Sequence, residues 1–427
     1  MAFETISVIG LGYIGLPTAA MFASRKKKVI GVDVNQFTVD TINKGKIHIV
    51  EPDLDMLVHT AVREGYLRAT TTPEAADAFL IAVPTPFLSS ENEGDIPQPD
   101  LKYIHSAVQA IAPVLKKGDL VILESTSPVG ATEQMADWLA KYRSDLTFPA
   151  GSGNSSDIRI AHCPERVLPG HVIRELVEND RVIGGLTSKC SEQAVELYKI
   201  FVSGDCVITN ARTAEMAKLT ENSCRDVQIA FANELSIICD KLDVDVWELI
   251  SLANRHPRIN ILQPGPGVGG HCIAVDPWFI VSKTPAEAKL IHTARKVNDS
   301  KPEWVVNKVK LAIGEYLIAN PNKTAKDVTI GCFGLAFKPD IDDLRESPAL
   351  NITKEIAHMH VGKTLAVEPN ISQLPDDLSN SFTLKSSDIA MSESGIIVLL
   401  VDHSEFKYLG KNLLKNKIVV DTKGIWI

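Results

Sequence analysis

Short aliphatic and β-branched runs alternate with longer segments of helical spacing along the first half of the chain. Residues 11–24, between the first two runs, carry apolar side chains at the spacing of a helix. Strands are predicted at 5–10, 27–34, 78–86, 119–126, 157–165 and 180–185. Strands that alternate with helices in this way are typical of a doubly wound parallel sheet.

The pattern changes to consecutive helices from residue 211 onward. Helices are predicted at 212–242, 245–254 and 286–317, with Pro302 as a candidate kink, and strands return at 327–337, 363–369, 395–402 and 417–424. We therefore expect an α/β chain of three domains. These are an N-terminal Rossmann-like domain at 1–210, a central all-helical domain with a long connecting helix at 211–320, and a C-terminal Rossmann-like domain at 321–427.

Two polar segments separate predicted elements of the first domain. Residues 89–100 and 149–157 are rich in glycine, proline and serine or in charged residues. We expect both segments to be exposed, mobile loops.

Composition and charge narrow the class of protein. The 427 residues are 45% hydrophobic and 23% charged, as in ordinary globular proteins. The net charge of −9 argues against nucleic acid and against an anionic membrane surface, because both attract basic proteins. Neither a basic leader nor an apolar run of about 18 residues is present, so no signal peptide or membrane span is expected.

The cysteines form no recognisable framework. Seven of them are scattered at 163, 190, 206, 224, 239, 272 and 332, without any Cys-x-x-Cys pair. This pattern favours reduced thiols in the cytoplasm over disulfides or a zinc site, so no metal is expected.

A glycine motif opens the first predicted helix. Gly10, Gly12 and Gly15 form Gly-x-Gly-x-x-Gly directly after a strand, and Asp33 ends the next strand. Glycines of this kind let a dinucleotide pyrophosphate approach the helix N-terminus, while the acid bonds the ribose 2′-hydroxyl and repels the phosphate of NADP. The motif predicts NAD binding, although FAD proteins share the fingerprint.

Cys272 stands in the unusual stretch "PGPGVGGHCIAVDP" at 264–277. By itself, a single cysteine is most often a packing residue. Here Asp276 and Pro277 resemble the N-cap and first position of a helix, so the thiol would precede a helix N-terminus, where the dipole favours thiolate. Metal ligation is less favoured, even with His271 adjacent, because no partner cysteine is near in sequence.

Two further groups of polar residues precede this stretch. Lys218, Asn222 and Arg225 have the spacing of one helix face, which could be plain solvent exposure or could place a cation near a reacting oxygen. Arg255, His256 and Arg258 form a local basic cluster in an acidic protein. Such a cluster suits a phosphate or carboxylate, but arginines are also common on ordinary surface loops.

Six motifs occur in an order that resembles the UDP-glucose/GDP-mannose dehydrogenase family. They are "GLGYIGLP", "ESTSPVG", "CPERVLPG", "AEMAKLTEN", "GPGVGGHC" and "GLAFKPDIDDLRESP", and the resemblance covers nearly the whole chain. It implies an NAD-dependent four-electron oxidation of a nucleotide sugar at C6, through a thiohemiacetal and a thioester on Cys272. It also implies a UDP-binding C-terminal domain and a homodimer that forms through the central helices and shares its active site.

The resemblance assigns roles to individual residues. The implied catalytic residues are Cys272 as nucleophile, Lys218 as acid and base with Asn222 beside it, and Asp276, Thr126 and Glu165 to organise or activate water. The implied NAD contacts are Gly10, Gly12, Tyr13, Ile14, Gly15, Asp33, Thr85, Thr126 and Arg345. The implied UDP-sugar contacts are Arg166, Val167, Lys218, Asn222, Arg225, His256, Arg258, Gly269, Phe337 and Lys338, with the 256–258 loop expected from the neighbouring subunit.

Val275 bears on the choice of sugar. UDP-glucose members of the family usually carry lysine at this position, directly before the aspartate. Together with "RHPRINILQPGPGVGGHCIAVDPWF", this departure makes the chain most similar to members that act on UDP-N-acetyl-D-mannosamine, in bacterial surface polysaccharide synthesis. The alternatives are UDP-glucose or UDP-N-acetylglucosamine, a two-electron hydroxyacid dehydrogenase, and a non-enzymatic NAD-sensing module.

Overall fold

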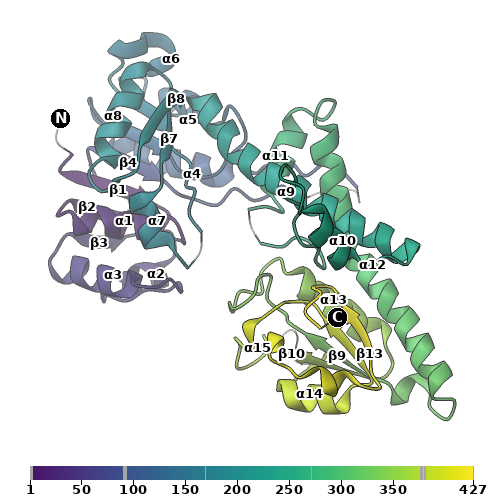
Figure 1. Ribbon diagram of the computed structural model, residues 1–427. Helices are drawn as coiled ribbons and strands as arrows, with labels where there is room; N and C mark the ends of the chain where they lie inside the picture. The colour runs from purple at the N-terminus through teal and green to yellow at the C-terminus, as the bar shows by residue number, and fades with distance from the viewer. Residues whose placement is uncertain are drawn as a thin grey trace. The chain divides into compact units, whose positions relative to one another are not determined.

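A computed structural model describes residues 3–89, 94–168, 170–270, 272–375, 378 and 381–426. The chain forms two compact units (Figure 1). The first comprises Met1–Glu221 with Trp278–Thr284, and the second comprises Asn222–Pro277 with Pro285–Ile427.

An eight-stranded sheet forms the centre of the first unit, in the order β3-β2-β1-β4-β5-β6-β7-β8. The strands are β1 Thr5–Ile9, β2 Lys28–Val32, β3 Leu67–Thr70, β4 Ala78–Ile81, β5 Leu120–Leu123, β6 Arg159–His162, β7 Arg181–Gly185 and β8 Cys206–Asn210. The expected parallel sheet is confirmed except at one pair, because β6 and β7 are antiparallel. In the described part of the link between them the one helix is the seven-residue α7, and the chain re-enters the sheet from the edge at which β6 ended.

Helices cover both faces of this sheet, as expected for a doubly wound fold. One buried cluster joins the sheet to α1, α3, α7 and α8, and another joins its opposite face to α4 and α5. The helices are α1 Gly15–Ser24, α2 Gln36–Asn43, α3 Leu54–Arg63, α4 Lys102–Ile111, α5 Ala131–Tyr142, α6 Pro149–Ser152, α7 Val172–Glu178 and α8 Ser188–Tyr198, with 3-10 turns at Ala112–Val114 and Gly153–Ser155.

The segment 149–157 is not the open loop that its composition predicts. It begins with α6 and continues through the 3-10 turn at Gly153–Ser155. Thr147 and Asp157 close it, because the Thr147 backbone N–H donates to Asp157 Oδ2 over 2.9 Å and the Asp157 N–H donates to Thr147 Oγ1 over 2.7 Å. In the other predicted loop, residues 90–93 lie outside the described residues.

Long helices and a second sheet make up the rest of the chain (Figure 1). The helices are α9 Ala211–Leu242, α10 Val246–Ala253, α11 Asp276–Lys283, α12 Lys289–Ala319, α13 Pro348–Met359, α14 Ser387–Glu393 and α15 Ser404–Lys407, with 3-10 turns at Ala325–Asp327 and Lys411–Leu414. The strands are β9 Thr329–Phe333, β10 Lys363–Val367, β11 Thr383–Leu384, β12 Ile396–Leu399 and β13 Ile418–Asp421. They form a parallel sheet in the order β11-β10-β9-β12-β13, which confirms the predicted C-terminal α/β unit.

A buried polar chain joins α9 to α12 within the second unit. Arg295 donates to Asp226 Oδ1 over 2.6 Å, and the Asn298 amide donates to the same oxygen over 2.8 Å. Asn233 then donates to Asn298 over 2.9 Å and accepts the backbone N–H of Gly265 over 2.9 Å. The chain of hydrogen bonds therefore runs from the helix interface to the loop that leads to Cys272.

Among the described helices, none has both the length and the apolar character needed to cross a membrane. Within the same part of the chain, no cluster of three or more His, Cys, Asp or Glu side chains has the arrangement of a metal site.

Candidate active site

The glycine motif forms the turn between β1 and α1. Gly10 has φ of 91°, and a Cβ there would lie 2.4 Å from the Ala82 carbonyl oxygen. A Cβ on Gly15 would lie 1.8 Å from the Gly10 carbonyl oxygen, so these two positions require glycine. A Cβ on Gly12 would have no other atom within 4 Å. The turn is therefore tightly packed on its inner side and leaves its backbone accessible to a pyrophosphate, as the motif predicts.

Asp33 lies beside this turn, directly after β2. Its Oδ2 accepts the backbone N–H of Leu11 over 3.0 Å, and its Oδ1 accepts that of Asn35 over 2.9 Å. The carboxylate is thus held against the glycine turn, where it can accept a hydrogen bond from a ribose hydroxyl and repel a 2′-phosphate. The arrangement fits NAD.

Other predicted NAD contacts gather at the same edge of the sheet. Tyr13 and Ile14 belong to the glycine turn itself. Thr85 and Thr126 follow β4 and β5, and the Thr85 hydroxyl donates to the Thr126 carbonyl oxygen over 2.6 Å. Since β4 pairs with β1, this is the edge at which the strand order reverses, the usual dinucleotide site of such sheets. Arg345 belongs to the second unit, where it pairs with Asp343.

Glu165 follows β6 and is almost fully buried. Its Oε2 pairs with Arg181 over 2.9 Å, and its Oε1 accepts the Arg166 backbone N–H over 2.7 Å. The Arg181 guanidinium also lies over the Tyr198 ring, 4.5 Å from its centroid. The predicted water-activating carboxylate is therefore held in one orientation by a buried cation.

A second buried carboxyl, Glu124, lies in the same cluster. Tyr198 Oη donates to Glu124 Oε1 over 2.6 Å. Burial raises the pKa of Glu124 to about 7, against the opposing charge of Arg181. Sequence reasoning missed both Glu124 and Arg181, although for Glu124 its position directly after an apolar strand run is a usable signal.

Three predicted substrate contacts of the first unit are partly exposed. Arg166 pairs with Glu221 over 2.6 Å, and both side chains are partly exposed. Val167 is half-buried against the core of this unit. Lys218 is half-buried on α9, one helical turn before Asn222.

Cys272 is exposed and lies in a turn directly before α11. Its carbonyl oxygen accepts the backbone N–H of Val275 over 3.1 Å and that of Asp276 over 2.9 Å. Asp276 is the first residue of α11 and not its N-cap as predicted, because the bond between residues 272 and 276 already has the helical i to i+4 spacing. The thiol still precedes the N-terminus of α11, as the sequence predicts.

Asn222 connects α9 to this turn. Its amide Nδ2 donates to Asp276 Oδ2, and Asp276 is buried. Three residues that the sequence singled out, Asn222, Cys272 and Asp276, therefore lie together within the second unit.

A cavity of about 390 Å³ lies within the second unit, at the carboxyl edge of its sheet. The predicted contacts Arg225 and Phe337 line it, as do Gly265, Asp402 and Lys423. Sequence reasoning missed Asp402 and Lys423, which form an ion pair over 3.0 Å after β12 and β13. The cavity is lined by prolines, by backbone and by a few charged side chains. Such a lining can bind the base and the phosphates of a nucleotide.

Some predicted substrate residues lie outside this cavity. Lys338 is half-buried beside Phe337 but does not line it. Gly269 packs against the adjacent segment, since a Cβ there would lie 2.4 Å from the Glu346 carbonyl oxygen. His256 and Arg258 are exposed in the loop after α10. A larger cavity of about 840 Å³ in the first unit has mostly apolar walls and contains none of the predicted site residues.

Comparison with known proteins covers nearly the full chain. Residues 4–202 match the NAD binding domain of the UDP-glucose/GDP-mannose dehydrogenase family, residues 212–300 its central domain and residues 331–427 its UDP binding domain.

Individual relatives are similar over their whole length. The UDP-N-acetyl-D-mannosamine dehydrogenase of Yersinia pestis is 66% identical over 426 residues, which is 100% of both chains. The NDP-N-acetyl-D-galactosaminuronic acid dehydrogenase of Ralstonia nicotianae is 63% identical and covers 99% of this chain and 96% of its own. The solved UDP-D-ManNAc dehydrogenase of Pyrococcus horikoshii aligns with a TM-score of 0.84 at 38% identity, over 99% of this chain and 96% of that one. The chain belongs to the UDP-glucose/GDP-mannose dehydrogenase family.

Proposed function

We propose that this protein oxidises the C6 alcohol of UDP-N-acetyl-D-mannosamine to a carboxylate, with two NAD+ reduced per sugar. The observation that carries the proposal is the exposed Cys272 in its turn before α11, with the Asn222–Asp276 pair beside it. The names of the most similar relatives support the substrate, and the NAD binding domain supports the oxidant.

The first unit holds NAD+ in this proposal. Gly10, Gly12 and Gly15 would hold its pyrophosphate, Asp33 would accept a hydrogen bond from its ribose, and Thr85 and Thr126 would complete its site. When bound, NAD+ accepts a hydride from carbon. The UDP moiety occupies the cavity lined by Arg225, Phe337 and Lys423, where the cations face its phosphates.

Oxidation begins at the C6 alcohol. Loss of the hydroxyl proton and of one hydride from C6 leaves an aldehyde. The Cys272 thiolate then forms a C–S bond to this carbon, and the carbonyl oxygen takes up a proton to give a thiohemiacetal. A sulfur nucleophile suits this step because the adduct keeps one hydrogen on carbon for a second oxidation.

Completion of the reaction requires water. Loss of the second hydride and of the hydroxyl proton converts the thiohemiacetal into a thioester. Water adds to the thioester carbon, the C–S bond breaks, and the thiolate of Cys272 is restored as the carboxylate leaves. Each hydride reduces one NAD+, so two NADH form per sugar.

The remaining catalytic residues stabilise and move protons. Lys218 serves as acid and base for the C6 oxygen, and Asn222 donates a hydrogen bond to it as the charge develops. Asp276, Thr126 and Glu165 orient water, and the Arg181 ion pair keeps Glu165 in one position for that role. The domain boundaries at 1–210, 211–320 and 321–427 assign NAD binding, dimerisation and UDP binding to successive parts of the chain.

Two features bear on which sugar the enzyme oxidises. Val275 stands where UDP-glucose members usually have lysine, which disfavours UDP-glucose. The Ralstonia relative bears the name of an N-acetylgalactosaminuronic acid enzyme at nearly the same identity, so a second N-acetylhexosamine is the specific competitor. The scattered cysteines favour the reducing cytoplasm, where UDP-sugars for surface polysaccharides are made.

A panel of UDP-sugars tests the activity directly. We expect UDP-N-acetyl-D-mannosamine to release two NADH per sugar consumed, measured by absorbance against the acid quantified by chromatography. UDP-N-acetylgalactosamine, UDP-N-acetylglucosamine and UDP-glucose should give a lower kcat/KM. A ratio of one NADH per sugar would contradict the four-electron reaction, and faster turnover of UDP-glucose would contradict the assigned sugar.

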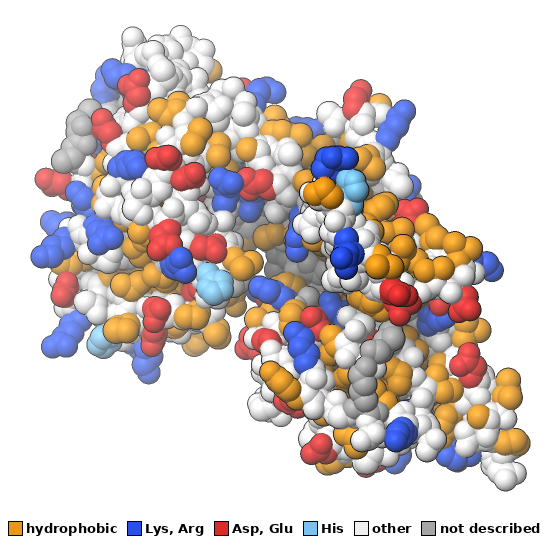
Figure 2. Space-filling model, in the orientation of Figure 1, with side chains coloured by type: hydrophobic (Ala, Val, Ile, Leu, Met, Phe, Trp, Pro, Cys, Tyr) orange, Lys and Arg blue, Asp and Glu red, His pale blue; other side chains and the backbone are white. Residues whose placement is uncertain are grey.

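We also propose that a second copy of the chain completes the site. Phe231, Ile238 and Leu242 recur on one face of α9 and are 54%, 43% and 66% exposed, and Leu252 on α10 is 58% exposed. Figure 2 shows hydrophobic side chains gathered over this part of the second unit. An exposed apolar helix face of this kind is typical of an obligate interface.

Light scattering tests the dimer. We expect the wild-type protein to have twice the mass of one chain, and Phe231→Glu to shift it toward monomers with parallel loss of activity, because the 256–258 loop would no longer reach a neighbouring site. A monomeric, fully active wild-type enzyme would refute the shared site.

A further inference from the structure

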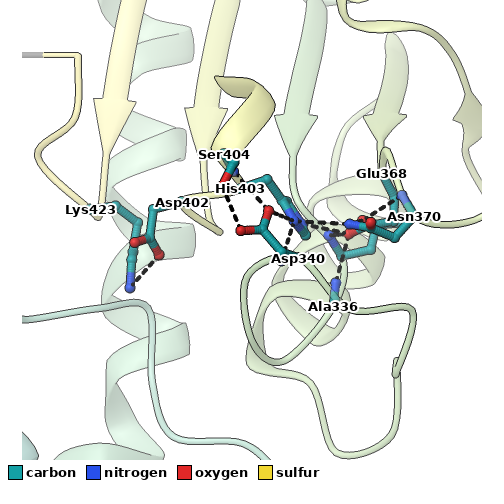
Figure 3. Close-up of polar contacts among 9 residues, drawn as sticks. Ala336, Asp340, Glu368, Asn370, Asp402, His403, Ser404 and Lys423 are labelled. Carbon is teal, nitrogen blue, oxygen red and sulfur yellow. Dashed lines mark hydrogen bonds and ion pairs between the residues drawn. The ribbon is translucent and has the colours of Figure 1, made fainter. Parts of the chain in front are cut away.

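A buried histidine–glutamate pair, His403 and Glu368, lies at the carboxyl edge of the second sheet (Figure 3). His403 follows β12 and Glu368 follows β10, and the two side chains are 1% and 0% exposed. His403 Nε2 lies 3.0 Å from Glu368 Oε2. The proposed chemistry uses neither residue.

The pair holds both ends of one loop. Glu368 Oε2 accepts the backbone N–H of Leu335 over 2.8 Å and that of Ala336 over 2.9 Å, where the loop begins. His403 Nδ1 accepts the backbone N–H of Asp340 over 3.0 Å, where the loop ends. Because Nδ1 accepts from a backbone N–H, the Nε2 proton is the one directed at Glu368.

The charge state of Glu368 is consistent with this role. Burial alone would raise the pKa of its carboxyl, but the hydrogen bonds from His403 and from the Leu335 and Ala336 N–H groups hold that pKa below its usual range. An ionised oxygen that accepts three N–H donors is a strong and directional anchor.

The loop and the segment before His403 both line the cavity. Ala336, Phe337 and Pro339 line it from the loop, and Leu400, Val401 and Asp402, which lead directly into His403, line it from the segment after β12. The position of the loop against this segment therefore depends on the bonds of His403. Ser404 adds a second link, since its hydroxyl donates to Asp340 Oδ2 over 2.6 Å.

We propose that His403 and Glu368 are positioning residues for nucleotide binding: they fix the 335–340 loop so that Phe337 faces the UDP moiety. The inference rests on the proposed function, because it takes the cavity to be the UDP site. Neither residue contacts the reacting carbon in this proposal. Their loss should therefore weaken nucleotide binding and leave the chemical step nearly intact.

Two variants separate the bond of His403 Nε2 from the bonds of Nδ1, which also lies 3.1 Å from the Asn370 amide nitrogen. His403→Asn can keep the acceptor for Asp340 N–H but cannot reach Glu368, whereas His403→Gln can reach Glu368 but loses the acceptor at Nδ1. We expect each to raise the Kd of UDP, measured by calorimetry, and the KM of the UDP-sugar about tenfold. The kcat and the KM of NAD+ should stay within about twofold.

His360→Gln is the matched control. His360 is also buried in the second unit, but its Nε2 bonds the Val328 carbonyl oxygen over 2.9 Å at the opposite, amino edge of the same sheet. A general loss of stability would affect both histidine sites, so the control should lower Tm without changing UDP affinity. Ser404→Ala, at an exposed position, loosens the same loop without emptying the core and should raise the UDP Kd two- to threefold.

The outcomes are distinguishable. Unchanged UDP affinity in folded His403→Asn, His403→Gln and Ser404→Ala would overturn the positioning role while the proposed reaction stands. An equal fall in kcat with no change in KM would also overturn it. If the wild-type protein bound no UDP, the proposed function would fail first and the positioning role with it.

Discussion

Replacement of Cys272 by alanine is expected to abolish formation of the uronic acid. Without the thiolate no C–S bond can form, so the aldehyde cannot be held for a second hydride transfer or released as a carboxylate. For a lost nucleophile we expect turnover to fall on the order of 10³-fold or more. The measurement is steady-state NADH release together with mass spectrometry of the products.

Cys224→Ala is the control for this experiment. Cys224 is also exposed and lies on α9, but the proposed reaction gives it no role. Its loss should leave turnover within about twofold. Cys272→Ala should still bind UDP as the wild type does, and Cys272→Ser should accumulate a covalent ester visible as an added mass. Near-normal acid formation by Cys272→Ala would contradict the nucleophile assignment.

Local sequence patterns were sufficient to predict the helices with strong apolar periodicity and the glycine turn. The glycine-free and proline-free segment 212–242 became α9 with one residue added at its start, and the turn at Gly10–Gly15 has the predicted geometry. Both features depend on interactions among neighbours in sequence. The long helix at 289–319 also matches, although its Pro302 does not end it.

Elements that depend on distant partners were harder to predict. β3 and β8, which the sequence analysis did not predict, are the edge strands of the first sheet. Neither has the long apolar run of a central strand, and Val207 and Ile208 of β8 are about half exposed. α6 was hidden in a polar segment because its order depends on the Thr147–Asp157 bonds across it.

The same limit applies to the site. Asn222, Cys272 and Asp276, which the structure places together, could be predicted as site residues because each belongs to a sequence motif. Arg181, which holds Glu165, and Lys423, which lines the cavity, carry no local signal, since only the strand order of each sheet brings them near. The antiparallel entry of β7 places Arg181 at the carboxyl edge, and a fully parallel sheet would not have done so.

Replacement of Arg295 by methionine is expected to cause the largest loss of stability. Arg295 and Asp226 are 1% and 0% exposed, so the variant would leave a carboxylate buried without its cation. Removal of one partner of such a pair costs about 3–5 kcal/mol. Because Asp226 also bonds Asn298, and through it Asn233 and Gly265, the loss should extend to the loop that leads to Cys272.

The pH dependence of this loss identifies its cause. Burial already raises the pKa of Asp226 above its usual range, against the charge of Arg295, and removal of that charge should raise it further. The folded state would then bind a proton that the unfolded state does not, so the stability of the variant should recover as the pH falls from about 8 to about 5. Urea unfolding at both pH values measures this recovery.

Lys308→Met provides the comparison that makes the result specific. Lys308 joins the same two helices through Asp240 over 2.6 Å, but its side chain is 33% and that of Asp240 is 38% exposed. Water screens this pair, so its loss should cost about 0–1 kcal/mol at either pH. Equal losses in the two variants would show that the contact between α9 and α12, and not the buried charge, determines stability. Arg295→Met with Asp226→Asn should recover part of the loss, because the fully buried charge at Asp226 is then absent, while Asp299, the other partner of Arg295, is half exposed.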